Sequence, residues 1–125
     1  MNTKEISELQ AGYEIDALIA EKVMLLRPEW THREPAGKKF KTEIGDVIVA
    51  ETAHYSENIT ATFDVIQQLR AMRFNVRVEL HKTYTTVTLW QFDTTEHGPR
   101  PTTCRADTVY LAVCRAALLA VMGGV

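Results

Sequence analysis

Apolar residues recur every three or four positions in three stretches of the chain, and every second position in a fourth. The first pattern is typical of a helix with one buried face, and the second of a strand with one buried face. Two stretches rich in proline, glycine and charge, 28–46 and 93–105, are predicted to be loops. The patterns predict helices at about 13–26, 57–72 and 107–122, and strands at about 74–81 and 84–92.

The stretch from Tyr55 to Leu80 carries the clearest of these patterns. Ser56 is predicted to cap its helix, because a serine hydroxyl can accept hydrogen bonds from the free N–H groups of a first turn. Every second residue from Phe74 to Leu80 is apolar, and the next strand follows closely enough for an antiparallel hairpin. We therefore predict one α+β domain over residues 1–125, with a small antiparallel sheet of two to four strands sandwiched between helices.

Two residues are predicted to mark where the first helical segment begins and ends. Asn2 can cap a leading turn that begins at residue 3, and Pro28 is predicted to stop the helix because its ring cannot continue one. The apolar run at 47–50 is either an edge strand or the approach to the next helix.

Composition and charge narrow the classes of protein. At 125 residues, 46% hydrophobic and 24% charged, the chain is predicted to be an ordinary globular domain with a core of its own. A net charge of −2 disfavours extensive nucleic-acid binding. There is no apolar run of about 20 residues and no apolar signal core, so a membrane location is not expected and the cytoplasm is the predicted compartment. Cys104 and Cys114 are expected to be reduced thiols.

The sequence contains no recognisable catalytic motif. Its four histidines are scattered, and none has the spacing of a metal-ligand pair, so neither a metal site nor a cofactor is predicted. Ser56 or Cys104 could in principle pair with His54 or His97 as a nucleophile and base, but a helix cap explains Ser56 more economically. We therefore expect a protein that is not an enzyme.

A binding site is easier to place. The start of a helix offers free N–H groups that suit phosphate or carboxylate, and three arginines lead from the far end of the same helix into the next strand. These arginines are either an anion-binding surface or a solvated face. Trp30 either lines a ligand surface or packs beneath its loop. The candidate ligand-binding residues are Tyr55, Ser56, Arg70, Arg73, Arg77 and Trp30.

Three blocks of the chain resemble the phage ABA sandwich domain family. They are AGYEIDALIAEKVM at 11–24, YSENITATFDVIQQLRAMRFNVRVEL at 55–80 and ADTVYLAVCRAALLAVM at 106–122. Leu25 stands where the family commonly has glycine, Asn58 where it has aspartate, and Phe63 where it has tryptophan. The resemblance implies helices on both sides of a small antiparallel sheet, in a protein encoded by a phage or prophage and acting in the bacterial cytoplasm.

From this setting we expect a non-enzymatic phage accessory protein. It would bind a small anionic or nucleotide-like ligand, sequestering a host nucleotide signal used in defence. The alternative is a protein–protein interaction module that inhibits or adapts a host or phage protein, and a small hydrolase or nucleic-acid binder is the weakest hypothesis. A ligand site shared across a homo-oligomer is compatible with the first function.

Overall fold

The computed structural model describes residues 2–25, 27–29, 39–41, 48–49, 54–91 and 101–122. Two antiparallel three-stranded sheets occur among them, with strand orders β1-β2-β3 and β4-β5-β6. The predicted α+β class, with a small antiparallel sheet packed against helices, is confirmed. In chain order the elements are α1 (Thr3–Ser7), α2 (Tyr13–Leu18), the π-helical turn η1 (Ile19–Val23), β1 (Arg27–Glu29), β2 (Lys39–Lys41), β3 (Ile48–Val49), α3 (Ile59–Ala71), β4 (Phe74–Leu80), β5 (Thr85–Gln91), β6 (Thr102–Ala106) and α4 (Val109–Met122).

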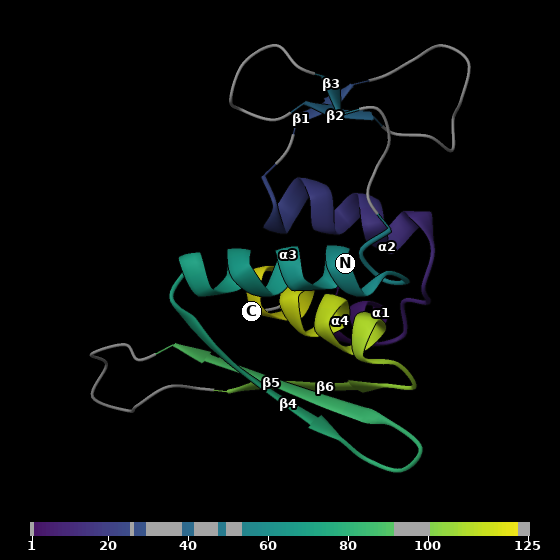
Figure 1. The fold of residues 1–125 in the computed structure, drawn as a ribbon, viewed down its shortest axis with the longest axis vertical. Coiled ribbons are helices and arrows are strands. Elements are labelled where there is room, and N and C mark those ends of the chain that lie inside the picture. The colour runs from purple at the N-terminus through teal and green to yellow at the C-terminus, as the bar shows by residue number, and fades with distance from the viewer. Residues whose placement is uncertain are drawn as a thin grey trace.

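Helix α4 lies at the centre of the described structure. It packs on β5 and β6 below, on α3 and α1 beside it, and on η1 above (Figure 1). Most of its residues from Leu111 to Leu119 are therefore buried, on every side of the helix. Its alanines and its single cysteine are small enough to let these neighbours approach closely.

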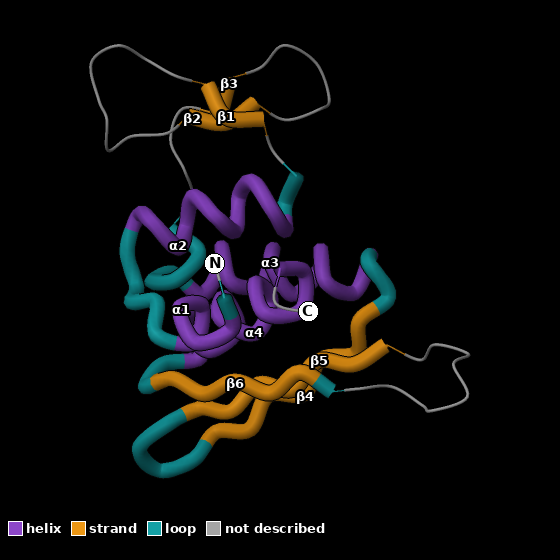
Figure 2. Tube along the Cα trace, turned by 180° about the vertical axis from the view of Figure 1, so that it is seen from behind, coloured by secondary structure: helices purple, strands orange, loops and turns teal. Residues whose placement is uncertain are grey.

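The described helices lie on one face of the β4-β5-β6 sheet, as the views from the front and from behind both show (Figures 1 and 2). Val87, Leu89 and Cys104 on the inner face are buried beneath α4. The outer face carries Thr88 opposite Arg77 on one side and opposite Thr103 on the other. None of the described helices is long and apolar enough to cross a membrane.

Of the two helix caps predicted from the sequence, one is confirmed and one is wrong. The side-chain oxygen of Asn2 accepts from the N–H of Glu5 at 2.8 Å, and the hydroxyl of Thr108 accepts from the N–H of Leu111 at 3.2 Å. Helix α3, however, is capped by Asn58, whose Oδ1 accepts from the N–H groups of Thr60 and Ala61. The prediction of Ser56 as this cap was wrong, because the chain makes a turn at residues 55–57 before the helix begins.

Three strands occur where loops were predicted. β1 overlaps the start of the predicted loop 28–46, and β2 lies inside it. β3 lies within the apolar run 47–50, for which an edge strand was one of the two predictions. More important for the site, β6 occupies the end of the predicted loop 93–105 and pairs with β5. The proline and glycine residues upstream of β6 led to the prediction of a loop, although the five residues 102–106 form a strand.

Leu25 closes the first helical segment in a backbone conformation that L-residues rarely adopt. The segment was predicted to reach residue 26, but it ends at Val23, with Met24 as its C-cap. Leu25 then has φ +58°, and its side chain is about half exposed. In this left-handed region the β-carbon of an L-residue crowds the following carbonyl oxygen, which is why helices commonly place glycine there. The glycine that the resembling sequences have at this position fits the observed backbone.

Replacing Leu25 by glycine is expected to stabilise the fold. Removing the β-carbon at φ +58° relieves the steric cost, and little packing is lost because the side chain is exposed. The net gain in the free energy of unfolding should be about 0.5–1 kcal/mol, after the entropy that glycine adds to the unfolded chain. Urea denaturation would measure it. Leu25→Ala is the control, since it shortens the side chain but keeps the β-carbon; an equal gain in both variants would contradict the explanation.

Candidate functional site

Tyr55 and Ser56 lie in the turn before α3, and both side chains are buried. The Ser56 N–H donates to Oδ1 of Asp16 at 2.8 Å, and the Ser56 hydroxyl accepts from the N–H of Gly12 at 3.1 Å. Asp16 is itself buried, with its second carboxylate oxygen 3.9 Å from Nδ1 of the exposed His54. A buried carboxylate therefore already occupies the space beside these two residues, and they hold the start of α3 to α2.

Burial changes the pKa values of Asp16 and Tyr55. Desolvation raises the pKa of Asp16. Hydrogen bonds from the side chain and backbone of Ser56 lower this pKa, but they offset only part of the rise. Glu57 nearby raises the pKa of Asp16 further, and His54 lowers it. Burial also raises the pKa of the Tyr55 phenol to about 12, with the charges of Asp64 and Asp16 adding to the rise.

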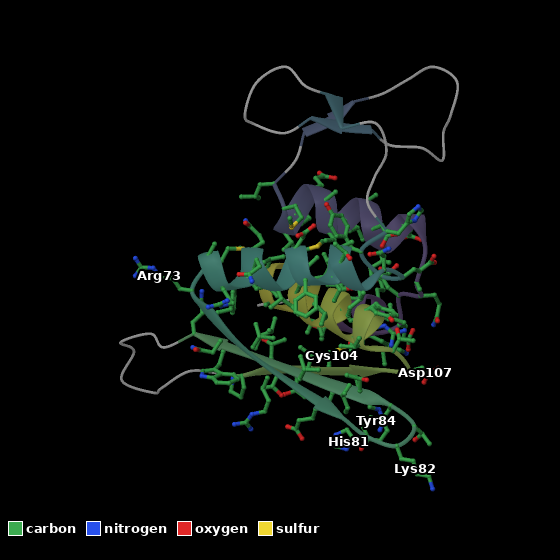
Figure 3. All side chains as sticks on the ribbon, in the orientation of Figure 1. Arg73, His81, Lys82, Tyr84, Cys104 and Asp107 are labelled. Carbon is green, nitrogen blue, oxygen red and sulfur yellow. The ribbon has the colours of Figure 1, made fainter. Side chains whose placement is uncertain are left out.

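The three arginines of the predicted cluster stand on three successive parts of the chain, α3, the joint after it and β4. Arg70 is exposed on α3 and donates to Oε1 of Gln67 at 3.2 Å. Arg73, with φ +70°, stands at the joint between α3 and β4 and points away from the body of the protein (Figure 3). Arg77 lies on the outer face of β4, where its guanidinium carbon is 5.6 Å from the ring centroid of Trp90. Trp30 lies outside the described residues.

A pocket of about 620 Å³ opens at the other end of the sheet. It is formed by the β4–β5 hairpin, the end of β6 and the first turns of α4, together with the segment after α1; in Figure 3, Tyr84 and Asp107 mark two of its sides. Its volume is in the range typical of small-molecule sites. The lining residues are Gln10, Thr83, Tyr84, Arg105, Ala106, Asp107, Leu111 and Arg115.

Two arginines, Arg105 and Arg115, line this pocket, and the guanidinium group of each contacts other residues. Nε of Arg115 donates to the carbonyl of Leu9 at 2.7 Å, and its Nη1 donates to the carbonyl of Arg105 at 3.2 Å. These bonds use two of the five N–H donors of Arg115. The Arg105 guanidinium carbon lies 5.4 Å from the ring centroid of Tyr84, which stacks on His81 with centroids 4.5 Å apart. The result is a polar pocket with pre-positioned hydrogen-bond donors.

The charges around the pocket favour an anion. Arg105 and Arg115 contribute two positive charges, against one carboxylate on Asp107 among the described lining residues. The pocket also lies at the N-terminus of α4, where the helix dipole is positive. Planar guanidinium groups form paired hydrogen bonds with phosphate or carboxylate oxygens, and Tyr84 adds an aromatic surface.

The thiols beside this region are poor nucleophiles. Burial raises the pKa of Cys104, and the positive charge of Arg115 offsets only part of that rise. Burial raises the pKa of Cys114 as well. Since the thiolate is the reactive form, both cysteines suit a structural role. In the part of the chain that the structure describes, no three His, Cys, Asp or Glu side chains gather into a potential metal site.

Sequence reasoning missed the two pocket arginines for different reasons. Arg105 fell in a predicted loop, although the alternation in Thr-Thr-Cys-Arg-Ala over 102–106 could have indicated a short strand with Cys104 inside and Arg105 outside. Arg115 stands in an otherwise apolar helix, and an arginine in such a setting is itself a signal of a partner. Both partners of Arg115 are backbone carbonyls, which no sequence pattern reveals.

The comparisons with known proteins agree with this architecture. A family model described as the phage ABA sandwich domain matches residues 17–118. The matched range includes all of α3 and the β4-β5-β6 sheet, and it ends within α4. A search of curated proteins returned no match.

Proposed function

The chain belongs to the phage ABA sandwich domain family, and we propose that it is a non-enzymatic phage accessory protein that binds a small anionic ligand. The observation that carries this proposal is the pocket at the N-terminus of α4, which Arg105 and Arg115 both line and in which two bonds to backbone carbonyls fix the guanidinium group of Arg115. A ligand with phosphate or carboxylate oxygens would find paired donors there. The proposed ligand is thus the anionic one expected from the sequence, but the proposed site is the pocket and not the residues predicted from the sequence.

Within this class, a nucleotide-like molecule is the proposed ligand. Phosphate oxygens would meet Arg105 and Arg115, and Tyr84 at the pocket wall offers a ring on which a base can stack. A phage protein with such a pocket could act by sequestration, removing a host nucleotide defence signal from solution without transforming it. The raised pKa of Cys104 supports binding rather than catalysis, because it keeps this thiol protonated despite the positive charge of Arg115.

Arg105→Ala is expected to weaken binding of the ligand about 10- to 100-fold, since hydrogen bonds to a charged group each contribute roughly 1.5–3 kcal/mol. The protein would be purified from infected host cells, weighed intact by native mass spectrometry and then denatured, so that the released ligand is identified by its mass. Isothermal titration of ligand-free protein with ADP as a probe would give the affinities.

Matched controls separate the two sites. Arg70→Ala and Arg77→Ala remove arginines of the sequence-predicted cluster and should leave the affinity unchanged. Loss of binding in these variants, with Arg105→Ala unaffected, would place the site on the predicted cluster. Absence of any released ligand, together with no heat of binding for ADP, would count against the proposed function itself.

The open outer face of the β4-β5-β6 sheet favours a second candidate function. No described helix covers this face, which carries Trp90 and Arg77 from neighbouring strands. An uncovered face with a large aromatic side chain is typical of protein-binding surfaces. The second candidate is therefore an interaction module that inhibits or adapts a host or phage protein. A host-lysate pull-down should then return a stoichiometric protein partner that Trp90→Ala loses and Arg105→Ala retains.

A further inference from the structure

Large apolar side chains are exposed along α3 and β4. Ile59 and Phe63 of α3 are 46% and 56% exposed, and Val78 and Leu80 of β4 are 38% and 77% exposed. Among the described residues these four make up all but one of the exposed large hydrophobic side chains, the other being Leu25. A contiguous apolar surface of this kind marks an interaction site more often than a scattered one does.

The four side chains come from neighbouring elements. α3 packs on β4, and both views show the helix running above this outermost strand of the sheet (Figures 1 and 2). Asp64 of α3 is close enough to the Tyr55 phenol, on the side of α2, to raise its pKa. Ile59 and Phe63, four residues apart, share one side of α3, and both are exposed. Val78 and Leu80 belong to the helix-facing row of β4, because they pair with the inner residues Val87 and Thr85.

The outer edge of β4 is unpaired in the described structure. β4 has β5 as its partner on one side, over all seven of its residues. The N–H of His81 donates to the carbonyl of Tyr84 at 2.9 Å and closes the hairpin. Because backbone direction alternates along a strand, the odd-numbered residues of β4 bond to β5 and the even-numbered ones, Val76, Val78 and Leu80 among them, point their N–H and C=O groups outward. An open edge of this length is a template for another strand.

The sequence of this edge is complementary to itself. If two copies of β4 pair antiparallel about a two-fold axis at Val78, Arg77 of each copy stands opposite Glu79 of the other, and Val76 stands opposite Leu80. An axis at Arg77 or at Glu79 would instead place like charges opposite each other, which is destabilising. An axis at Val76 would leave Leu80 beyond the partner strand, which begins at Phe74. Of the axes at residues 76 to 79, only the one at Val78 satisfies both the charges and the apolar row.

We propose that β4 pairs with β4 of a second copy about a two-fold axis at Val78, which joins the two sheets into one of six strands. The pairing satisfies the outward backbone groups of Val76, Val78 and Leu80 on both copies. It also brings the exposed side chains of Ile59 and Phe63 on the two α3 helices toward the shared apolar seam. Such an isologous interface closes on itself, so the product is a dimer and not a filament. This interface is independent of the proposed ligand pocket.

Val78→Cys tests the axis directly. In a hydrogen-bonded antiparallel pair the two Cα atoms are about 5.5 Å apart, within the range that a disulfide spans. Mild oxidation should therefore convert most of the variant to a covalent dimer on a non-reducing gel. Lys82→Cys is the accessible control, because its two copies would be roughly 27 Å apart along the paired strands. Wild-type protein controls for Cys104 and Cys114, which are both buried. Equal crosslinking of the two variants would overturn the proposal.

Charge exchange tests the alignment of the two strands. Arg77→Glu puts glutamate opposite Glu79 twice in the dimer and should raise the dissociation constant at least ten-fold in sedimentation experiments. Adding Glu79→Arg to that variant should restore dimerisation, since the opposite charges again face each other. Both variants lack the contact of Arg77 with Trp90, so its loss cannot explain a difference between them. A wild-type monomer at high micromolar concentration, or no recovery in the double variant, would refute the pairing.

Discussion

Asp16→Ala is expected to lower the free energy of unfolding by about 2–3 kcal/mol, because it leaves buried donors without their acceptor. The Ser56 N–H, which donates to Asp16 at 2.8 Å, would lose this acceptor at a position where Ser56 is 1% exposed. In the part of the chain that the structure describes, every buried side-chain N and O atom has a hydrogen-bond partner. The unpaired donor that Asp16→Ala leaves would therefore be an exception in this fold. Urea denaturation would measure the change. Glu14→Ala, exposed on the same helix, should change stability by less than about 0.5 kcal/mol.

The same carboxylate makes stability depend on pH. Burial raises the pKa of Asp16 in the folded state above its value in the unfolded chain. The protonated form is therefore the one that folding favours, and the stability that this shift contributes is lost as the pH rises through the folded pKa. Asp16→Asn keeps an oxygen for the Ser56 N–H but does not titrate. Relative to this variant, the wild-type protein should become more stable as the pH falls from 7 to 4. A trend in the opposite direction would show that the hydrogen bonds from Ser56 outweigh desolvation.

The elements that the sequence predicts well are those whose signal is local. α3 and β4 each repeat one periodicity for seven residues or more, and β5 is rich in β-branched residues. The observed bounds of all three elements lie within two residues of the predicted ones. Asn2 caps its helix as expected because a cap acts within three residues of itself. The family resemblance rests on the same blocks and was confirmed by the match over 17–118.

The candidate site could not be predicted, because its geometry depends on contacts between distant parts of the chain. Asp16 reads as a polar residue on the solvent face of its helix, yet it is buried by Ser56, which is 40 positions away. Arg115 is fixed by the carbonyl of Leu9, 106 positions away. The arginines at 70, 73 and 77 are close in sequence, and the left-handed backbone at Arg73 marks the change of direction between helix and strand.

Leu118→Ala should be the most damaging of the substitutions considered, at roughly 2–5 kcal/mol of unfolding free energy. Leu118 is fully buried in α4, the helix that the sheet, α1, α3 and η1 all contact. Truncation to alanine would leave a cavity there. The neighbouring side chains cannot fill this cavity without losing contacts with their other partners. Val121→Ala, on the same helix but only partly buried, is the matched control and should cost clearly less.

Leu118→Ala also tests whether ligand binding depends on the stability of the core. α4 carries Arg115 into the pocket, but Leu118 does not line the pocket itself. Below its lowered melting temperature, Leu118→Ala should therefore bind ADP as the wild-type protein does, whereas Arg105→Ala should lose binding with little loss of stability. Thermal unfolding with and without ADP would distinguish these two behaviours. If Leu118→Ala abolished binding while still folded, the donors in the pocket would depend on the packing of the core and not on the backbone bonds that hold Arg115.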